Sequence, residues 1–292
     1  MKSKIVWIQG ITCNGNSHSF LNYQNLDLFL ENIEFLYHPI LPSKFTLKEL
    51  VNKKFDFDIL IIEGAINKKY KRANGTFFDL FKKLAFKAKY IIALGNCASF
   101  GGVFRSFEKK EIKGLVFDGE VENGFFKELK RKIINIPGCP AHPEWLVYVI
   151  FMLIDKKRIL LDKYLRPKEI YSYTVHMGCN KNEYFEWKVD AKSFGVKEGC
   201  LFYMHGCQGP FTHGSCNKIL WNEVSSKTRV GAPCFGCTEP TFMKKNLFET
   251  KTYMSIPANM PLGVPKRAYL TLTGVAKSFK IDRLTKRLID EN

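Results

Sequence analysis

The sequence contains no run of about 18 consecutive apolar residues, the length that a helix needs to span a membrane. Its last residues, 276–292, are expected to form a charged amphipathic helix, which is too polar to anchor in a membrane. A strand pattern begins at Lys4, which leaves no room for a secretory or twin-arginine signal. We therefore expect a cytoplasmic protein without a membrane anchor.

Acidic residues are scarce, since 28 Asp and Glu stand against 45 Lys and Arg and give a formal net charge of +17. A charge of this size is typical of proteins that bind nucleic acid. The lysines, however, occur in short pairs scattered along the chain and belong to no nucleic-acid motif. This distribution favours a solvated basic surface over a nucleic-acid partner and leaves an acidic protein partner open.

Internal repeats and low-complexity tracts are absent as well, and 46% of the residues are hydrophobic, so we expect an ordered globular chain. Cysteine, in contrast, is abundant, with nine residues. Disulfides are disfavoured in the cytoplasm. Clustered cysteines there are metal ligands, redox groups or small buried apolar side chains.

The first half of the chain alternates apolar strand-like runs with helix-compatible stretches near 17–32, 45–54, 75–87 and 120–130. Several runs are apolar on both faces, as expected where helices cover both sides of a parallel sheet. This pattern predicts an α/β fold with a flavodoxin-like, doubly wound parallel sheet over residues 1–160. The predicted strands are residues 4–9, 33–40, 58–63, 90–95 and 132–137.

A second domain is predicted over residues 161–292, following a basic segment that ends near Pro167. Regular alternation stops there, and Gly, Pro, His and Cys become dense between His176 and Pro240. Such a segment has too few periodic apolar positions to hold together by packing alone. We expect an irregular domain that is stapled by inorganic clusters.

Three cysteines of the first domain occupy equivalent places. Cys13, Cys97 and Cys139 each follow a predicted strand, and each lies in a loop that contains glycine. Because the carboxyl ends of parallel strands meet at one edge of a sheet, these thiols are expected to converge. Glu63, at the end of another predicted strand, should lie beside them and serve a proton path, a subunit interface or a local hydrogen-bond network.

The second domain offers six cysteines and one close histidine, which could bind zinc or iron–sulfur clusters. Seven ligands divide awkwardly into tetrahedral zinc sites but naturally into a [4Fe–4S] and a [3Fe–4S] cluster. The set comprises His176, Cys179, Cys200, Cys207, Cys216, Cys234 and Cys237.

These motifs together resemble the small subunit of [NiFe]-hydrogenases over most of the chain. The resemblance is carried by "WIQGITCNGN" (7–16), "DILIIEGAI" (58–66), "GNCASFGGV" (95–103), "NIPGCPAHPEWL" (135–146), "GCQGPFTHGSC" (206–216) and "PCFGCTEP" (233–240). It implies three clusters in a row. Cys13, Cys97 and Cys139 would hold the proximal one, Cys216, Cys234 and Cys237 a medial [3Fe–4S] cluster, and His176, Cys179, Cys200 and Cys207 a distal [4Fe–4S] cluster.

The chain departs from the family pattern at Asn16, where the family has the fourth proximal cysteine. An amide oxygen is a poor iron ligand beside thiolates, and His18 is another candidate for the fourth position. The alternatives are a three-iron cluster, a four-iron cluster with water or an outside ligand, and no proximal cluster. The spacing of Cys200 and Cys207 is also one residue longer than usual, and Ser226–Lys227 stands where a fourth medial ligand would be.

The resemblance implies an electron-transfer subunit that pairs with a [NiFe]-hydrogenase-type large subunit and with a redox protein at the distal end. Hydrogen chemistry would belong to the large subunit, because this chain has no paired Cys-x-x-Cys motifs suited to a nickel–iron site. One alternative is an accessory protein: a redox sensor, a cluster carrier or an assembly factor. A basic nucleic-acid-binding protein with structural zinc is a third hypothesis.

Overall fold

The computed structural model describes residues 2–72, 75–107 and 111–243, together with residues 247, 252–253, 256–257, 265, 268, 271–272 and 275. The tail expected to be helical, 276–292, lies outside the described residues. The chain forms two compact units. The first comprises Met1–Ser172 and Cys237–Met243, and the second comprises Tyr173–Gly236 and Lys244–Asn292. Residues 161–172, placed in the second domain by the sequence analysis, thus belong to the first unit.

A five-stranded parallel sheet forms the centre of the first unit, with the strand order β2-β1-β3-β7-β9. This order is typical of flavodoxin-like sheets, so the predicted fold class is confirmed. All five predicted strands are present within a few residues of their expected bounds. They are β1 (Ser3–Gln9), β2 (Ile33–Tyr37), β3 (Ile59–Glu63), β7 (Tyr90–Leu94) and β9 (Ile133–Ile136).

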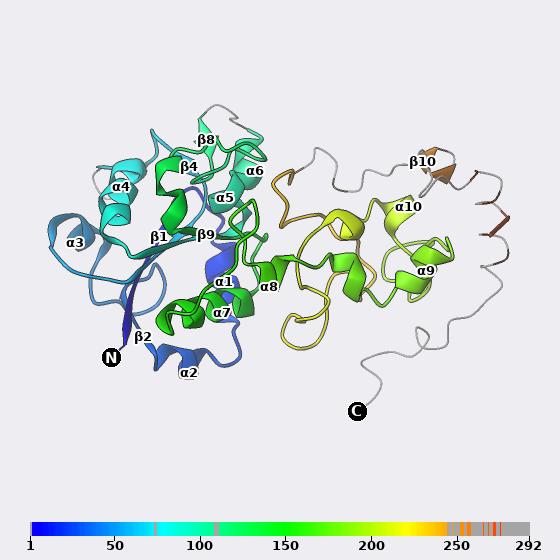
Figure 1. Ribbon diagram of the computed structural model, residues 1–292, viewed down its shortest axis with the longest axis horizontal. Helices are drawn as coiled ribbons and strands as arrows, with labels where there is room; N and C mark the ends of the chain where they lie inside the picture. Colours follow the sequence, from blue (N-terminus) through cyan, green and yellow to red (C-terminus); the bar gives the residue numbers. More distant parts are fainter. Residues whose placement is uncertain are drawn as a thin grey trace. The chain divides into compact units, whose positions relative to one another are not determined.

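Helices cover both faces of this sheet (Figure 1). Helices α3 (Leu47–Asn52) and α4 (Phe77–Lys87) pack on one face, where Leu50 and Phe81 join a core that includes Val6 and Leu60 of the strands. On the other face, Trp7 lies 5.4 Å from the ring of Phe20 in α1 (Gly15–Leu21), and α1 contacts α7 (Pro143–Ile154). Side chains of a strand alternate between faces, and Ile5, Val6, Trp7 and Ile8 are all fully buried, so β1 is apolar on both faces over this stretch.

Two predicted helices differ from the structure. The stretch 17–32 forms α1 and a separate α2 (Leu26–Leu30), because Asn22 Nδ2 donates to the carbonyl of His18 and ends the first helix. Residues 120–126 are not helical, and only a 3₁₀ turn, η1 (Lys127–Lys132), follows. Their backbone pairs with the chain before it instead, since the amide of Gly124 donates to the carbonyl of Val116.

The loops of the first unit carry small elements. Two short helices follow β7, α5 (Gly95–Phe100) and α6 (Gly102–Arg105), and α8 (Lys168–Tyr171) lies near the end of the unit. Two antiparallel pairs complete it. They are β4 (Ile66–Asn67) with β8 (Ile112–Lys113), and β5 (Lys71–Arg72) with β6 (Gly75–Thr76).

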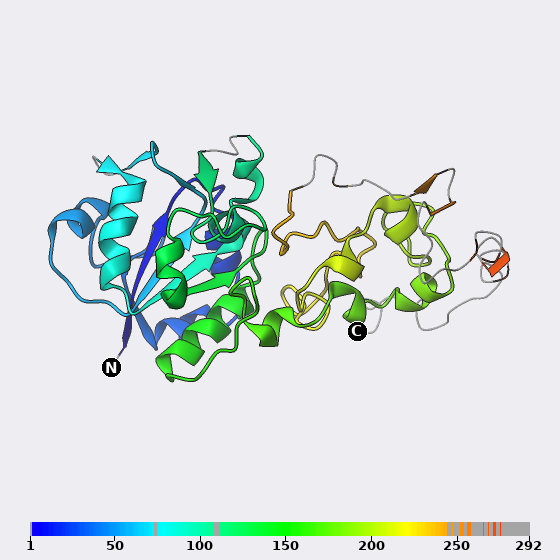
Figure 2. The ribbon, with the colours of Figure 1, turned by 45° about the horizontal axis from the view of Figure 1, so that its top comes forward.

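The second unit consists mainly of loops (Figure 2). Its buried apolar clusters are small, and cysteines belong to them. No helix in the described part of the chain is long and apolar enough to cross a membrane. The elements with defined bounds are η2 (Val175–Gly178), α9 (Asn182–Glu186), α10 (Phe202–His205), η3 (Gly209–Phe211), β10 (Thr252–Tyr253) and β11 (Ile256–Pro257).

Candidate iron–sulfur sites

The carboxyl ends of the central strands are aligned by the sheet register. Gln9 pairs with Glu63, Glu63 with Leu94, and Leu94 with Ile136. The loops that leave these strands carry Cys13, Cys97 and Cys139, so all three thiols start from the same sheet edge. Cys13 and Cys139 are exposed, whereas Cys97 is partly buried.

The three thiols are close enough to influence one another electrostatically. The pKa of the Cys97 thiol is raised to about 12, chiefly by burial and further by Cys139 and Cys13. The loop makes room for this thiol at Gly102, whose φ is +54°, because a Cβ there would lie 2.5 Å from Cys97 Sγ. A bound iron cation would lower the pKa of this thiol, because metal ligation requires the thiolate form.

Glu63 anchors the loop that carries Cys13. Its side chain is fully buried, and donors from β1 and from the following loop surround both carboxylate oxygens. Oε1 accepts from Thr12 Oγ1, Asn16 N and Ser17 N, and Oε2 accepts from Trp7 Nε1, Gln9 Nε2 and Ser17 Oγ, at 2.5 to 3.3 Å. Of the three roles considered from the sequence, the structure supplies the hydrogen-bond network directly.

The Asn16 side chain lies between the other two cysteine loops. Asn16 Oδ1 accepts a hydrogen bond of 2.9 Å from the backbone amide of Ala141, two residues after Cys139. Its amide nitrogen would lie 2.3 Å from a Cβ on Gly95, a residue with a φ of +84°, so only glycine leaves room for it there. Asn16 thus joins two loops through its carboxamide, and His18, the other fourth-ligand candidate, is exposed on α1.

In the second unit, a cavity is lined by all four of the residues assigned to the distal cluster. His176 comes from η2, Cys179 follows it, and Cys200 and Cys207 flank α10. Burial lowers the pKa of His176 and raises those of Cys200 and Cys207. A neutral imidazole is the form that binds metal.

Backbone amides point at the sulfur atoms of this cavity. Cys179 Sγ accepts from Lys181 N at 3.4 Å, and Cys207 Sγ accepts from Gly209 N at 3.5 Å and from Cys234 N at 3.3 Å. Hydrogen bonds to cysteine sulfur are one of the ways in which proteins set the reduction potential of iron–sulfur clusters. The donor set and its surroundings therefore fit such a cluster.

Lys181 also lines this cavity and has no counterpart among the residues predicted from the sequence. Only 3% of it is exposed, and its ammonium donates to the carbonyls of Val196, Lys197 and Gly199 at 2.7 to 3.3 Å. Burial lowers its pKa. The sequence alone does not indicate that this lysine is buried, because most lysines are solvated.

The three residues assigned to the medial cluster are divided between the units. Cys234 is buried in the second unit, and Cys216 packs against the same apolar cluster. Cys237 belongs to the first unit. Asn96 Nδ2 donates to its backbone carbonyl at 3.0 Å. Asn96 is a further residue of the site that sequence reasoning missed.

None of the nine cysteines forms a disulfide bond. Within the described ranges, no three His, Cys, Asp or Glu side chains are grouped closely enough to hold one metal ion. A single tetrahedral zinc ion needs donors about 2.0 to 2.3 Å from one point. In an iron–sulfur cluster, each thiolate binds a different iron atom, so wider spacing of the cysteines is compatible with a cluster.

This combination of a flavodoxin-like sheet and a cysteine-rich loop unit defines the class of hydrogenase small subunits. The family model for the C-terminal part of the NiFe/NiFeSe hydrogenase small subunit matches residues 171–249, and that for the 20 Kd subunit of NADH ubiquinone oxidoreductase matches residues 13–153. The chain is 32% identical to the F420 non-reducing hydrogenase II small subunit of Methanosarcina mazei, over 82% of this chain and 73% of that protein. It belongs to the NiFe hydrogenase small subunit family.

A second relative extends this result to bacteria. The periplasmic [NiFe] hydrogenase small subunit 1 of Nitratidesulfovibrio vulgaris is 32% identical, over 82% of this chain and 80% of that protein. Among solved structures, the reduced, active Ni-Fe-Se hydrogenase from Desulfomicrobium baculatum superposes with a TM-score of 0.72 at 25% identity. That match covers 86% of this chain and 100% of the other.

Proposed function

We propose that this chain is the iron–sulfur electron-transfer subunit of a [NiFe]-hydrogenase-type complex. It would relay electrons between a nickel–iron centre on a large subunit and a redox partner at the His176 end. The observation that carries the proposal is the cavity lined by His176 and three cysteines, with backbone amides donating to the sulfur atoms of two of them. The convergence of three cysteine loops at the sheet edge supports a second centre.

The first unit would hold the proximal cluster through Cys13, Cys97 and Cys139. The exposure of two of these thiols supports a site that lies against a large subunit. Asn16, His18 and an outside ligand are the candidates for the fourth position. Because Asn16 Oδ1 already accepts from Ala141 N, we favour an outside ligand or a three-iron cluster.

The second unit would hold the distal [4Fe–4S] cluster through His176, Cys179, Cys200 and Cys207. Cys216, Cys234 and Cys237 would hold a medial [3Fe–4S] cluster. The chain would bind the clusters, exclude water and set their potentials through hydrogen bonds to sulfur, and the clusters would supply the electron-transfer chemistry. We further propose that the protein acts in the cytoplasm.

A second candidate is an accessory protein, such as a redox sensor, a cluster carrier or an assembly factor. The observation that favours it is Asn16, because a proximal site with three thiolates would bind its cluster less firmly than one with four. This candidate would bind clusters without taking part in hydrogen turnover.

Purification of the tagged chain from its own host, without oxygen, distinguishes the two candidates. The electron-transfer proposal predicts that a large subunit with stoichiometric nickel co-purifies and that the complex reduces a dye with hydrogen. An iron-containing chain without nickel and without a large subunit would favour the accessory role.

A further inference from the structure

Asn96 lies between the cysteine loops of the first unit. It is 1% exposed and precedes Cys97 in the first turn of α5. Its backbone amide donates to the carbonyl of Gly138 at 2.9 Å, and Gly138 precedes Cys139. The peptide group of Asn96 therefore connects two of the three proximal cysteine loops.

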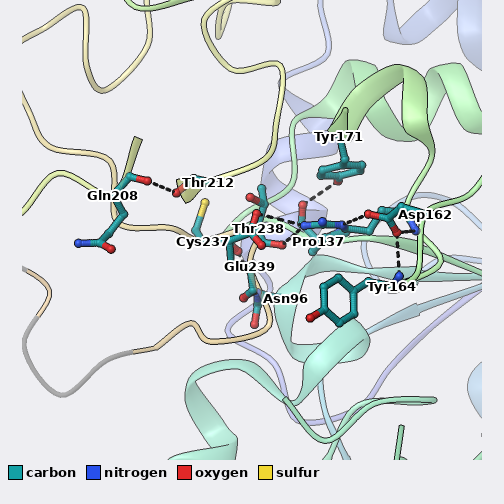
Figure 3. A network of polar contacts seen from close by, with 11 residues as sticks. Asn96, Pro137, Asp162, Tyr164, Tyr171, Gln208, Thr212, Cys237, Thr238 and Glu239 are labelled. Atoms are coloured by element: carbon teal, nitrogen blue, oxygen red, sulfur yellow. Dashed lines mark hydrogen bonds and ion pairs between the residues drawn. The ribbon is translucent and has the colours of Figure 1, made fainter. Parts of the chain in front are cut away.

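The side chain of Asn96 reaches a third cysteine segment. Its Nδ2 donates to the carbonyl of Cys237 at 3.0 Å and to that of Glu239 at 2.9 Å, within the first unit (Figure 3). One amide group thus supplies both of its protons to the segment that carries an expected medial ligand. Buried hydrogen bonds of this kind hold a backbone segment firmly, because breaking them leaves polar groups unsatisfied.

Arg166 holds the same segment at the next residues. It is 3% exposed, and its Nη1 donates to the carbonyl of Thr238 and to Glu239 Oε1, both at 3.2 Å. Its Nε donates to Asp162 Oδ2 at 2.8 Å, which fixes the guanidinium. Two buried side chains therefore fasten residues 237–239 to the sheet unit, and Asn96 alone of the two is bonded to Cys237.

We propose that Asn96 is a positioning residue that fixes Cys237, an expected ligand of the medial centre, relative to the proximal loops of Cys97 and Cys139, and that it thereby tunes the electronic coupling of the two centres. The inference rests on the proposed electron-transfer function. The route runs from the backbone of Cys97 through the Asn96 side chain and across one hydrogen bond to the carbonyl of Cys237. With both clusters bound, one electron would leave the proximal centre for each one that enters the medial centre, and Asn96 would keep both amide protons.

The Asn96→Asp variant tests this assignment, because it keeps the size of the side chain and removes the NH₂ group that donates to both carbonyls. The complex is purified without oxygen and poised so that both centres are paramagnetic. The measurement is their magnetic interaction in the EPR spectrum, alongside iron and sulfide per chain. We expect the interaction to weaken or vanish while the iron content stays at the wild-type level.

Asn135→Asp is the matched control. Asn135 is fully buried in β9, and its Nδ2 donates to the carbonyl of Tyr164 at 2.8 Å. This variant loses the same kind of bond in the same unit without touching a cysteine segment. It should lower the melting temperature and leave the magnetic interaction unchanged. An equal loss of the interaction in both variants would show that Asn96 acts only through general stability, and it would overturn the inference.

Asn96→Thr is a second variant for the case in which Asn96→Asp does not fold. Its single hydroxyl can donate to only one of the two carbonyls. It should show an intermediate interaction. A wild-type interaction in whichever Asn96 variant folds, at full iron content, would overturn the inference and leave the proposed function intact. A wild-type chain without iron–sulfur centres would overturn both.

Discussion

The two units of this chain are held together by different means. The first has a five-stranded sheet covered by helices, with a continuous core that includes Ile62, Phe81 and Leu84. In the second, the longest helix with defined bounds has five residues, and one small apolar cluster includes Cys207 and Cys234 themselves. The first unit can fold by burying apolar surface, whereas we expect the second to depend on clusters bound by its cysteines.

This difference explains why chemistry is distributed as it is. In the first unit, rigid strands bring short loops to one edge, and buried groups such as Glu63 and Asn96 fix those loops. In the second unit, the residues around the cavity come from loops and single helical turns. We therefore expect loss of the candidate ligands to affect only the function of the first unit but also the folding of the second.

Removal of the metal should reveal the difference in stability between the two units most clearly. Treatment with an iron chelator under reducing conditions should unfold the second unit and leave the sheet of the first in place. The second unit should lose folding free energy on the order of 10 kcal/mol, by analogy with structural metal sites in small domains. Hydrogen exchange followed by mass spectrometry measures both units in one sample. Full protection of residues 173–236 in the metal-free chain would contradict the comparison.

Replacement of Glu63 by Gln should damage only the first unit. The new amide group would face donors that now point at a carboxylate, so we expect a loss of about 3 kcal/mol in the free energy of unfolding. The loop with Cys13 should become mobile, and proximal iron should fall while the EPR signal of the distal centre persists. Glu120→Gln, at an exposed position, is the control and should change neither property.

Acid should also destabilise the first unit through His38. Burial among Trp7, Phe20 and Phe35 lowers the pKa of this histidine to about 4, below its ordinary value of 6.5. The folded state therefore favours neutral His38, and its contribution is complete above pH 6.5 and lost as the pH falls toward 4. The loss amounts to about 3 kcal/mol, since one pKa unit corresponds to about 1.4 kcal/mol.

Denaturant unfolding between pH 7 and pH 4 measures this effect. The variant His38→Asn retains an acceptor for the amides of Ile40 and Leu41, which His38 Nδ1 binds at 3.1 and 3.0 Å, but does not titrate. It should flatten the pH dependence. An unchanged pH dependence in His38→Asn would refute the assignment.

The smallest effect on stability is expected from Asn16→Cys. The lost hydrogen bond to Ala141 N should cost about 1 kcal/mol. The added thiol should complete the proximal site and change its EPR signal, while the signals of the other centres stay constant. Asn22→Cys, exposed after α1, is the control. An unchanged signal and iron content in Asn16→Cys would show that position 16 does not face the proximal site.

Much of the fold follows from local pattern. Runs such as Ile59–Glu63 are apolar on both faces, which indicates a covered parallel strand before any contact is known. The prediction of a helix at 120–130 was wrong over residues 120–126, because backbone pairing of this stretch with 115–118 decides the structure there. Periodicity in sequence does not report such pairing.

The candidate sites divide in the same way. Cysteine spacing indicates the groups of ligands, since few side chains bind iron. The groups that hold these loops are ordinary residues. Asn96 lies within the motif "GNCASFGGV", but its residue type, like that of Arg166 and Lys181, does not distinguish it from solvated residues of the same type. Their roles depend on burial and on partners far along the chain, as with the bond from Asn96 to Cys237.

The most direct test of the account is the content of iron, acid-labile sulfide and zinc in the full chain, purified without oxygen. A three- or four-iron proximal cluster, a three-iron medial cluster and a four-iron distal cluster predict about ten to eleven iron atoms per chain. A chain with zinc and neither iron nor sulfide would contradict the account. A value of about seven iron atoms would show that the sheet edge binds no proximal cluster.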